Sequence, residues 1–183
     1  GCVFEDLQTK TNWKKYGTAL YACQAGFRIN GQIDNPPYTD PYYSTPCTFN
    51  NYKNAIAIVG SAEKPVKIYN TLFSDNSAGV NAKNADALSI LSCSFSSGST
   101  SYSSDIHGLI LDSCNFYRIE NNQFSGIGNG IKIIGKTEDN NTIRLNTFTH
   151  LCRAIEVYGT NGTNLSNGNP PSPELTGLQF ECN

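Results

Sequence analysis

The side chains best suited to chemistry gather in the segment from residue 105 to residue 112. It reads Asp-Ile-His-Gly-Leu-Ile-Leu-Asp, so Asp105, His107 and Asp112 frame a short apolar run, and Lys132 follows one sequence repeat later. Clustered carboxylates can protonate a glycosidic oxygen and activate a nucleophile, or hold calcium beside a basic residue. A histidine just before a strand is more often solvated or bonded to backbone. We therefore expect no catalytic residue, and these four are the candidates if the chain is an enzyme.

A second group of candidates consists of aromatic side chains in two irregular segments. Tyr38, Tyr42 and Tyr43 lie in a proline-rich stretch, and Trp13 and Tyr16 lie in a shorter one. Rings on a proline-stiffened loop can stack on sugar rings with little loss of conformational entropy. The alternative is that they pack against the flank of the protein and close the loops. These five residues are the predicted ligand-binding set, and a polysaccharide or cell-surface glycan is the predicted ligand.

The overall composition excludes several other classes of partner. A formal net charge of -2 and 15% charged residues give no electrostatic reason to expect nucleic acid or an anionic membrane surface. No apolar run approaches the roughly 20 residues of a membrane-spanning helix. No Cys-x-x-Cys pair suggests zinc or redox chemistry, and we expect neither metal nor cofactor. The chain has neither methionine nor a signal peptide, which suggests a processed or excised piece.

The elements that would position the candidates are set by a recurring phrase of six residues, Ile-x-x-[Asn/Cys/Thr]-x-Phe. A second phrase, Gly or Ala followed by apolar-x-apolar, begins six residues after the phenylalanine in most copies. Before Gly108 the step is longer, because a serine-rich stretch is inserted. The first phrase occurs at residues 68–73, 90–95, 119–124 and 143–148, and the second begins at Ala55, Gly79, Gly130 and Ala154.

Self-similarity of 22 to 24 residues without helical periodicity predicts an all-β fold, a right-handed parallel β-helix solenoid of about seven rungs. Alternation within the phrases places Ile131 and Ile133 inside and Lys132 outside. We expect Asn122 to stack on Asn146 as an amide ladder at a bend, in the left-handed conformation that asparagine tolerates. Further columns are expected for Ile68, Ile90, Ile119 and Ile143, and for Phe73, Phe95, Phe124 and Phe148.

The cysteines fit the same repeat. Seven are present, at positions 2, 23, 47, 93, 114, 152 and 182, and an odd number excludes complete internal pairing. Cys2, Cys47 and Cys93 each stand two residues before a phenylalanine, where other copies have threonine or asparagine. We therefore expect buried, unpaired thiols in an interior ladder. One or two disulfides remain the alternative.

We expect residues 1–183 to form a single β-helix segment with loop insertions near 5–18, 30–46, 96–105 and 160–176. Loops that depart from the repeat are the usual site of function in a solenoid. Both chain ends match incomplete copies of the first phrase. The segment is therefore expected to be a fragment of a longer coil, with the rest of the parent polypeptide as partner at both open ends.

Three motifs together resemble a known group of proteins. They are Gly-Cys-x-Phe at residue 1, Asn-x-Phe-x5-Gly-Ile-x-Ile from residue 122, and Gly-Leu-Gln-Phe-Glu-Cys-Asn from residue 177. The chain resembles the β-helix segments of large secreted surface proteins of Bacteroidota-type bacteria and, more broadly, is similar to the pectin-lyase-like superfamily. The resemblance implies a place outside the cell, at its surface, reached through type 9 secretion. The segment around His107 also resembles the site segments of polygalacturonases, but the paired aspartates of those enzymes are not at matching positions.

Three functions are compatible with these observations. The first is a stiff spacer in an adhesin or other surface protein, and the second is glycan binding by the aromatic loops. The third is a polysaccharide lyase or glycoside hydrolase of the pectin-lyase-like type. We expect the spacer, with glycan binding as its companion, because every regular position serves stacking. Insertions that converge on one side would favour binding, and scattered insertions would favour a plain spacer.

Overall fold

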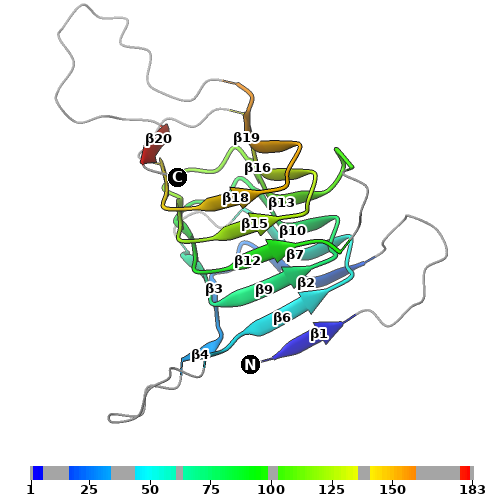
Figure 1. The fold of residues 1–183 in the computed structure, drawn as a ribbon. Helices are drawn as coiled ribbons and strands as arrows, with labels where there is room; N and C mark the ends of the chain where they lie inside the picture. Colours follow the sequence, from blue (N-terminus) through cyan, green and yellow to red (C-terminus); the bar gives the residue numbers. More distant parts are fainter. Residues whose placement is uncertain are drawn as a thin grey trace, which may run out of the picture.

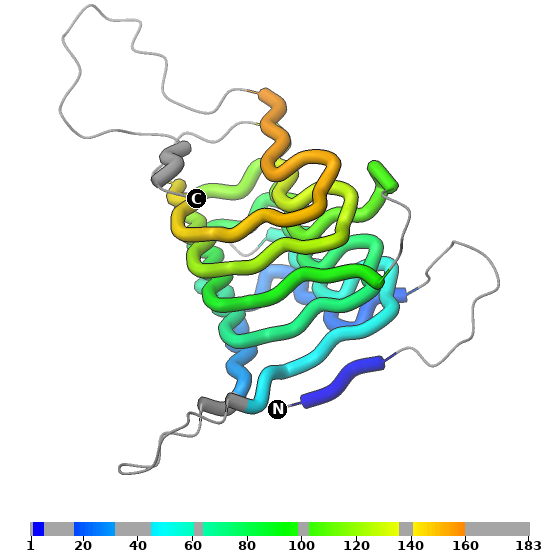
Figure 2. The backbone as a smooth tube through the Cα atoms, in the orientation of Figure 1, coloured from blue at the N-terminus to red at the C-terminus, as the bar shows by residue number. Residues whose placement is uncertain are grey.

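The chain winds into a coil whose wall is made of three parallel β-sheets (Figures 1 and 2). The structure is a computed structural model and describes residues 2–5, 17–33, 44–60, 64–98, 103–135, 141–159 and 178–181. These ranges contain twenty strands and no helix. They therefore include no helix long and apolar enough to cross a membrane. The predicted all-β, right-handed parallel β-helix is confirmed.

Each sheet receives one strand from every turn, and all pairs within the three sheets are parallel. The first sheet contains β1 (Val3–Glu5), β6 (Cys47–Asn50), β9 (Thr71–Ser74), β12 (Ser94–Ser96), β15 (Gln123–Ser125) and β18 (Thr147–Thr149). The second contains β2 (Thr18–Cys23), β7 (Asn54–Val59), β10 (Ala78–Lys83), β13 (His107–Asp112), β16 (Asn129–Ile134) and β19 (Arg153–Val157). The third contains β3 (Phe27–Asn30), β8 (Val66–Tyr69), β11 (Leu88–Leu91), β14 (Arg118–Glu120), β17 (Asn141–Arg144) and β20 (Leu178–Glu181).

The described strands make six turns, since each sheet has six strands, and the expected count of about seven is not confirmed. The reason lies in the first turn. Phe4 and Phe49 occupy the same position in neighbouring strands β1 and β6, although 45 residues separate them along the chain. Phe49 and Phe73 in the next turn are 24 residues apart, as the repeat predicts. Two long connections of this turn, from β1 to β2 and from β3 to β6, therefore use the length of an additional turn.

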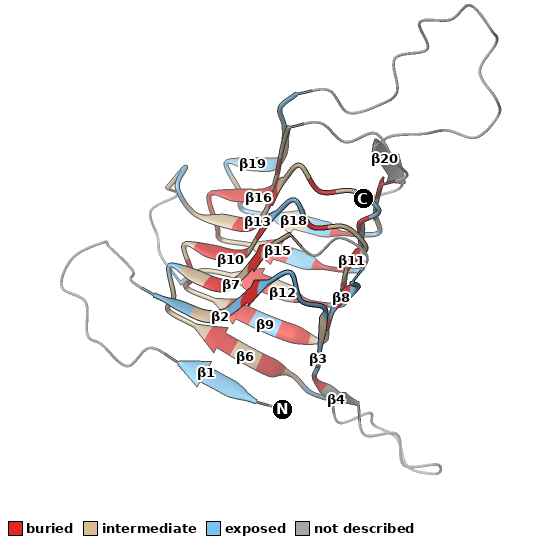
Figure 3. Cartoon of the chain, turned by 180° about the vertical axis from the view of Figure 1, so that it is seen from behind, coloured by how far each residue is buried: buried red, intermediate tan, exposed pale blue. Residues whose placement is uncertain are grey.

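The core is the predicted set of stacked columns. Successive phenylalanine rings lie nearly parallel, with centroids 4.6 to 5.4 Å apart, from Phe4 through to Phe148. The predicted isoleucine column is also confirmed, because its members pair with one another in the third sheet and are fully buried. Figure 3 shows that buried residues are concentrated in the middle turns, with more exposed residues in the first and last turns.

At Gly79 and Gly108 of the second phrase, the phenylalanine stack leaves no room for a side chain. A Cβ atom on Gly108 would lie 2.6 Å from a ring carbon of Phe124 and 2.7 Å from the carbonyl oxygen of Gly130. Gly79 stands in the same relation to Phe95 and to the carbonyl of Gly108. These distances are too short for any real side chain, so the ring of the following turn fills the space that a side chain would occupy.

The amide ladder is confirmed, but the expected backbone conformation is wrong. Asn122 Nδ2 donates to Asn146 Oδ1 at 3.0 Å, and both side chains are buried. The left-handed conformation falls one residue earlier, at Asn121 with φ of 53° and at Leu145 with φ of 56°. The turn itself therefore takes the positive φ. The following asparagine is free to point inward and bond the backbone across the bend.

The predicted ladder of buried thiols holds for two of its three members. Cys47 and Cys93 are buried, and the six described cysteines are all unpaired. Cys2 is exposed instead, because its strand is the first of its sheet and no described turn covers it. Cys23 and Cys152 are also exposed, which corrects the general expectation of buried thiols.

The insertions leave the coil at three different corners. The segment near 5–18 joins the first sheet to the second, as does that near 96–105, while the segment near 160–176 joins the second to the third. Along the chain, residues 34–43 stand between the short strands β4 (Gln32–Ile33) and β5 (Ser44–Thr45), which pair antiparallel and connect β3 of the third sheet to β6 of the first. This pair has no counterpart in the repeat and was not predicted.

Candidate functional site

The four candidate residues for catalysis do not form one group. His107 opens β13 and Asp112 closes it, so an extended strand of about 16 Å separates them. Asp112 is an ion-pair partner of Lys83, with Nζ and Oδ2 3.1 Å apart, and its Oδ1 accepts a hydrogen bond from the Ser113 hydroxyl. Asp105 is exposed in the turn before β13. An acid pair made of Asp105 and Asp112 is therefore not available in this fold.

His107 is held by its neighbour on the next turn. Its Nδ1 lies 3.3 Å from Asn129 Nδ2, and the same amide nitrogen donates to the backbone carbonyl of Ser104 at 2.8 Å. Since the amide nitrogen is a donor, the Nδ1 of His107 accepts, and the neutral ring carries its proton on Nε2. Burial, followed by the positive charge of Lys132, lowers the pKa of His107. The imidazole is therefore neutral near pH 7.

Lys132 lies beside a carboxylate that was not among the predicted site residues. Its Nζ is 3.9 Å from Glu156 Oε2 and 5.5 Å from the centre of the Tyr158 ring. Glu156 Oε1 accepts from the Tyr158 hydroxyl at 2.6 Å and lies 3.1 Å from an Arg153 guanidinium nitrogen. The Tyr158 hydrogen bond, helped by the charges of Arg153 and Lys132, lowers the pKa of Glu156.

We refer to His107, Asn129, Lys132, Arg153, Glu156 and Tyr158 as the Lys132–Glu156 cluster. Register explains it, because Lys132 and Glu156 are direct neighbours in the outward column of the second sheet. The sequence also shows this column, because it consists of the third residue of each Gly/Ala phrase. Arg153 and Tyr158 carried no such signal, since they flank the phrase at its ends.

The cluster combines a neutral imidazole, a cation and an ionised carboxylate on an open sheet face. Hydrolysis of a glycosidic bond ordinarily needs two carboxyl groups in different protonation states. In the cluster Glu156 is the single carboxylate, and its hydrogen bonds keep it ionised. Among the described residues, no three His, Cys, Asp or Glu side chains gather as a possible metal site. The arrangement suits holding a polar group better than breaking a bond.

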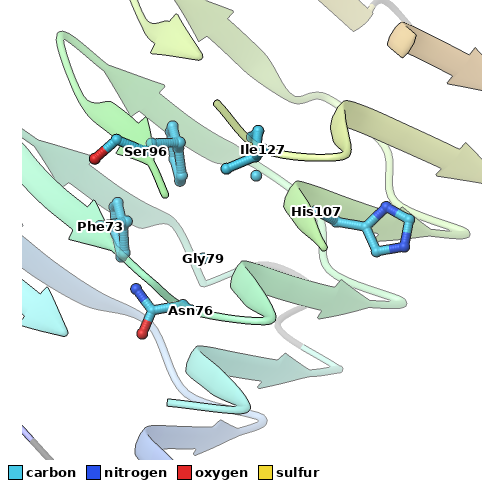
Figure 4. A pocket seen from close by; sticks show the side chains of 8 residues that line it. Phe73, Asn76, Gly79, Ser96, His107 and Ile127 are labelled. Carbon is cyan, nitrogen blue, oxygen red and sulfur yellow. The ribbon is translucent and has the colours of Figure 1, made fainter. Parts of the chain in front are cut away.

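A small hollow beside the cluster is a packing gap. It lies between the phenylalanine stack and the glycine corner, and it has room for about one water molecule. Figure 4 shows the His107 ring directed away from it and Asn76 beneath Phe73. Both polar atoms of the Asn76 side chain bond the backbone: Oδ1 accepts from the N–H of Tyr52, and Nδ2 donates to the carbonyl of Phe49.

A second group of charges lies on the outer face of the third sheet. Glu120 accepts hydrogen bonds from both Arg118 and Arg144, and its side chain is 5% exposed. The Arg118 hydrogen bond is the main cause that lowers the pKa of Glu120, and Arg144 adds to it. Glu120 follows the core residue Ile119 in β14 and faces outward, but the two arginines cover it. A carboxylate shielded in this way stabilises neighbouring strands and is not presented to a ligand.

The predicted aromatic residues Trp13, Tyr16, Tyr38, Tyr42 and Tyr43 lie outside the described residues. The described strands that flank their two segments meet at different corners of the coil, because one segment joins the first sheet to the second and the other joins the third to the first.

Comparison with known proteins gives one result. Residues 7–169 match a family model described as right handed beta helix region. No curated protein and no solved structure gives a significant match.

Proposed function

Because this chain belongs to the right-handed β-helix family, we propose that it is a non-catalytic structural module, a stiff spacer of an extracellular surface protein. Its direct partners are the neighbouring parts of the parent polypeptide, and glycan contact by the aromatic segments accompanies the spacing role. The supporting observation is the continuity of the core: one phenylalanine stack runs through all six described turns.

The geometry of a stacked coil fits this role. Each turn adds about 4.8 Å along the axis, so six turns give a rod on the order of 29 Å long. Parallel strands hydrogen-bond along the axis, so tension applied to the two ends is shared by many backbone bonds. The scattered corners at which the insertions leave the coil also favour a spacer over a single converging binding surface.

The experiment is a screen of the protein against a panel of polysaccharides, with binding and the release of reducing or unsaturated ends measured on the same samples. We expect no release from any substrate. Binding that is lost in Tyr42→Ala, without a change in stability, would establish the adhesive part of the proposal.

The alternative is a lyase or hydrolase of the pectin-lyase-like type, and the Lys132–Glu156 cluster is the observation in its favour. Release of sugar ends by the wild-type protein would overturn the spacer proposal. His107→Ala and Glu156→Gln would then decide whether this cluster is the active site, with Asp112→Asn at the far end of β13 as the matched control.

A further inference from the structure

Two cysteines occupy neighbouring positions in the first two strands of the first sheet. Val3 pairs with Thr48, so Cys2 stands opposite Cys47, and the backbone N–H of Thr48 donates to the carbonyl of Cys2 at 2.8 Å. Both thiols are free. We infer that Cys2 and Cys47 form a disulfide under oxidising conditions and that this bond fastens the first turn to the second.

The spacing of the strands permits the bond. Neighbouring strands lie about 4.8 Å apart, and the Cα atoms of a disulfide are usually about 4.4 to 6.8 Å apart. Cys47 is in register with Thr71 in a column whose described members in the middle turns point into the coil. To form the bond, the Cβ atoms of Cys2 and Cys47 must also move slightly closer together. Strand β1 can supply this movement, since its residues are exposed and β6 is its one described neighbour.

The other described cysteines have no such partner. Cys23 pairs in register with Val59. Cys93 stands between Thr71 and Asn122 in its column. The juxtaposition of two thiols is therefore particular to Cys2 and Cys47 among the cysteines that the structure describes.

The bond forms by thiol–disulfide exchange with a small-molecule disulfide. Cys2 is exposed and reacts first: its thiolate attacks one sulfur of the reagent, and the other sulfur leaves as a thiolate that takes up a proton. Cys47, after losing its proton, attacks the Cys2 sulfur and releases the second reagent thiol. Two cysteines are thereby oxidised, and the reagent is reduced to two thiols.

The bond would close the longest connection between equivalent described strands, that between β1 and β6. A crosslink across a long connection restricts the unfolded chain and raises stability. We therefore expect oxidation to raise the melting temperature of the protein.

The test treats the full chain with oxidised glutathione and measures intact mass, linked peptides and melting temperature. Apart from any glutathione bound to other exposed cysteines, the expected product has lost the mass of two hydrogen atoms, contains a Cys2–Cys47 linked peptide, and melts at a higher temperature than the reduced protein. Cys2→Ser should abolish all three effects, and Cys23→Ser, which changes another exposed cysteine, should retain them.

Three other products would overturn the proposal: a stable glutathione adduct on Cys2 with Cys47 still open to alkylation after unfolding, a linkage between other cysteines, or a disulfide-linked dimer. Cys47→Ser provides a second check that does not depend on Cys2. In that variant the exchange should stop at the mixed disulfide, so Cys2 should carry one glutathione, with no intramolecular link and no rise in melting temperature.

Discussion

Asn122 and Asn146 stack as neighbouring rungs of a buried amide ladder, and Asn122 also bonds the backbone of the preceding turn. Its Nδ2 donates to Asn146 Oδ1 at 3.0 Å and to the carbonyl of Ile90 at 2.9 Å. Its Oδ1 accepts from the backbone N–H of Cys93 at 2.9 Å. One buried amide therefore satisfies backbone groups that the bend leaves without a strand partner.

Replacing Asn122 with leucine should destabilise the coil more than replacing it with threonine. Leucine leaves the N–H of Cys93 and the carbonyl of Ile90 without this partner, at about 1–3 kcal/mol for each buried group. Threonine occurs at the equivalent position 71, where its hydroxyl donates to the carbonyl of Tyr69. Urea denaturation of both variants measures the difference. Equal losses would mean that the volume of the side chain matters and its hydrogen bonds do not.

Phe124→Ala should lower the free energy of unfolding by about 3–5 kcal/mol, because it removes a fully buried ring from the middle of the stack. The neighbouring residue Gln123 faces outward and is exposed, so Gln123→Ala is the matched control and should change stability little. Chemical denaturation followed by circular dichroism gives both values. A small effect of Phe124→Ala would show that the stack is not what holds the turns together.

Gly108→Ala should destabilise the coil by about 1–3 kcal/mol, since the added methyl group would overlap the Phe124 ring and the Gly130 carbonyl. Gly98 is exposed, and a Cβ there would come no closer than 3.8 Å to Asp75. Gly98→Ala is therefore the control for a glycine without a close neighbour, and thermal melting compares the two. If Gly108→Ala left the stability unchanged, the phenylalanine stack would have to shift freely to make room for the methyl group, which would contradict the prediction.

Acid should destabilise the protein partly through Glu120. Its pKa is lowered in the folded state by Arg118 and Arg144, whereas in the unfolded chain it returns to its ordinary value of 4.5. Stability from this carboxylate is thus complete above that value and is lost as the pH falls through the lowered, folded pKa. Melting temperatures of wild type and Glu120→Gln across this range provide the test. The gap between them should close as the pH falls, and parallel curves would contradict this role of Glu120.

The buried thiols should resist alkylation in the folded protein. Burial raises the pKa of Cys93 to about 12 and that of Cys114 to about 11, so neither forms the reactive thiolate at mildly alkaline pH. Cys23 and Cys152 are exposed and should react with iodoacetamide under the same conditions. Peptide mass spectrometry before and after unfolding distinguishes the two groups. Rapid labelling of Cys93 in the folded state would show that the turns around it open.

The coil could be predicted from the amino-acid sequence alone, because each repeat of the sequence forms one turn of the structure. A residue such as Ile119 or Phe124 stacks on its own copy one turn away, so an offset along the chain becomes a contact in space. The positions that face outward follow the same rule, and the repeat offset alone places Lys132 beside Glu156 in that column. Stacking at a fixed offset is a local property, and local properties survive in a sequence pattern.

Tertiary contacts determine what happens at the corners and ends of the coil. Asp112 and His107 are apart, since the two ends of one strand cannot share a site. Two arginines cover Glu120, Tyr158 contacts Glu156, and Cys2 is exposed in a strand with one described neighbour. These outcomes follow from side-chain reach around a bend and from which face of a turn lacks a neighbour. Side-chain reach and the absence of a neighbouring turn do not recur at a fixed interval along the chain. The sequence repeat therefore could not predict these contacts.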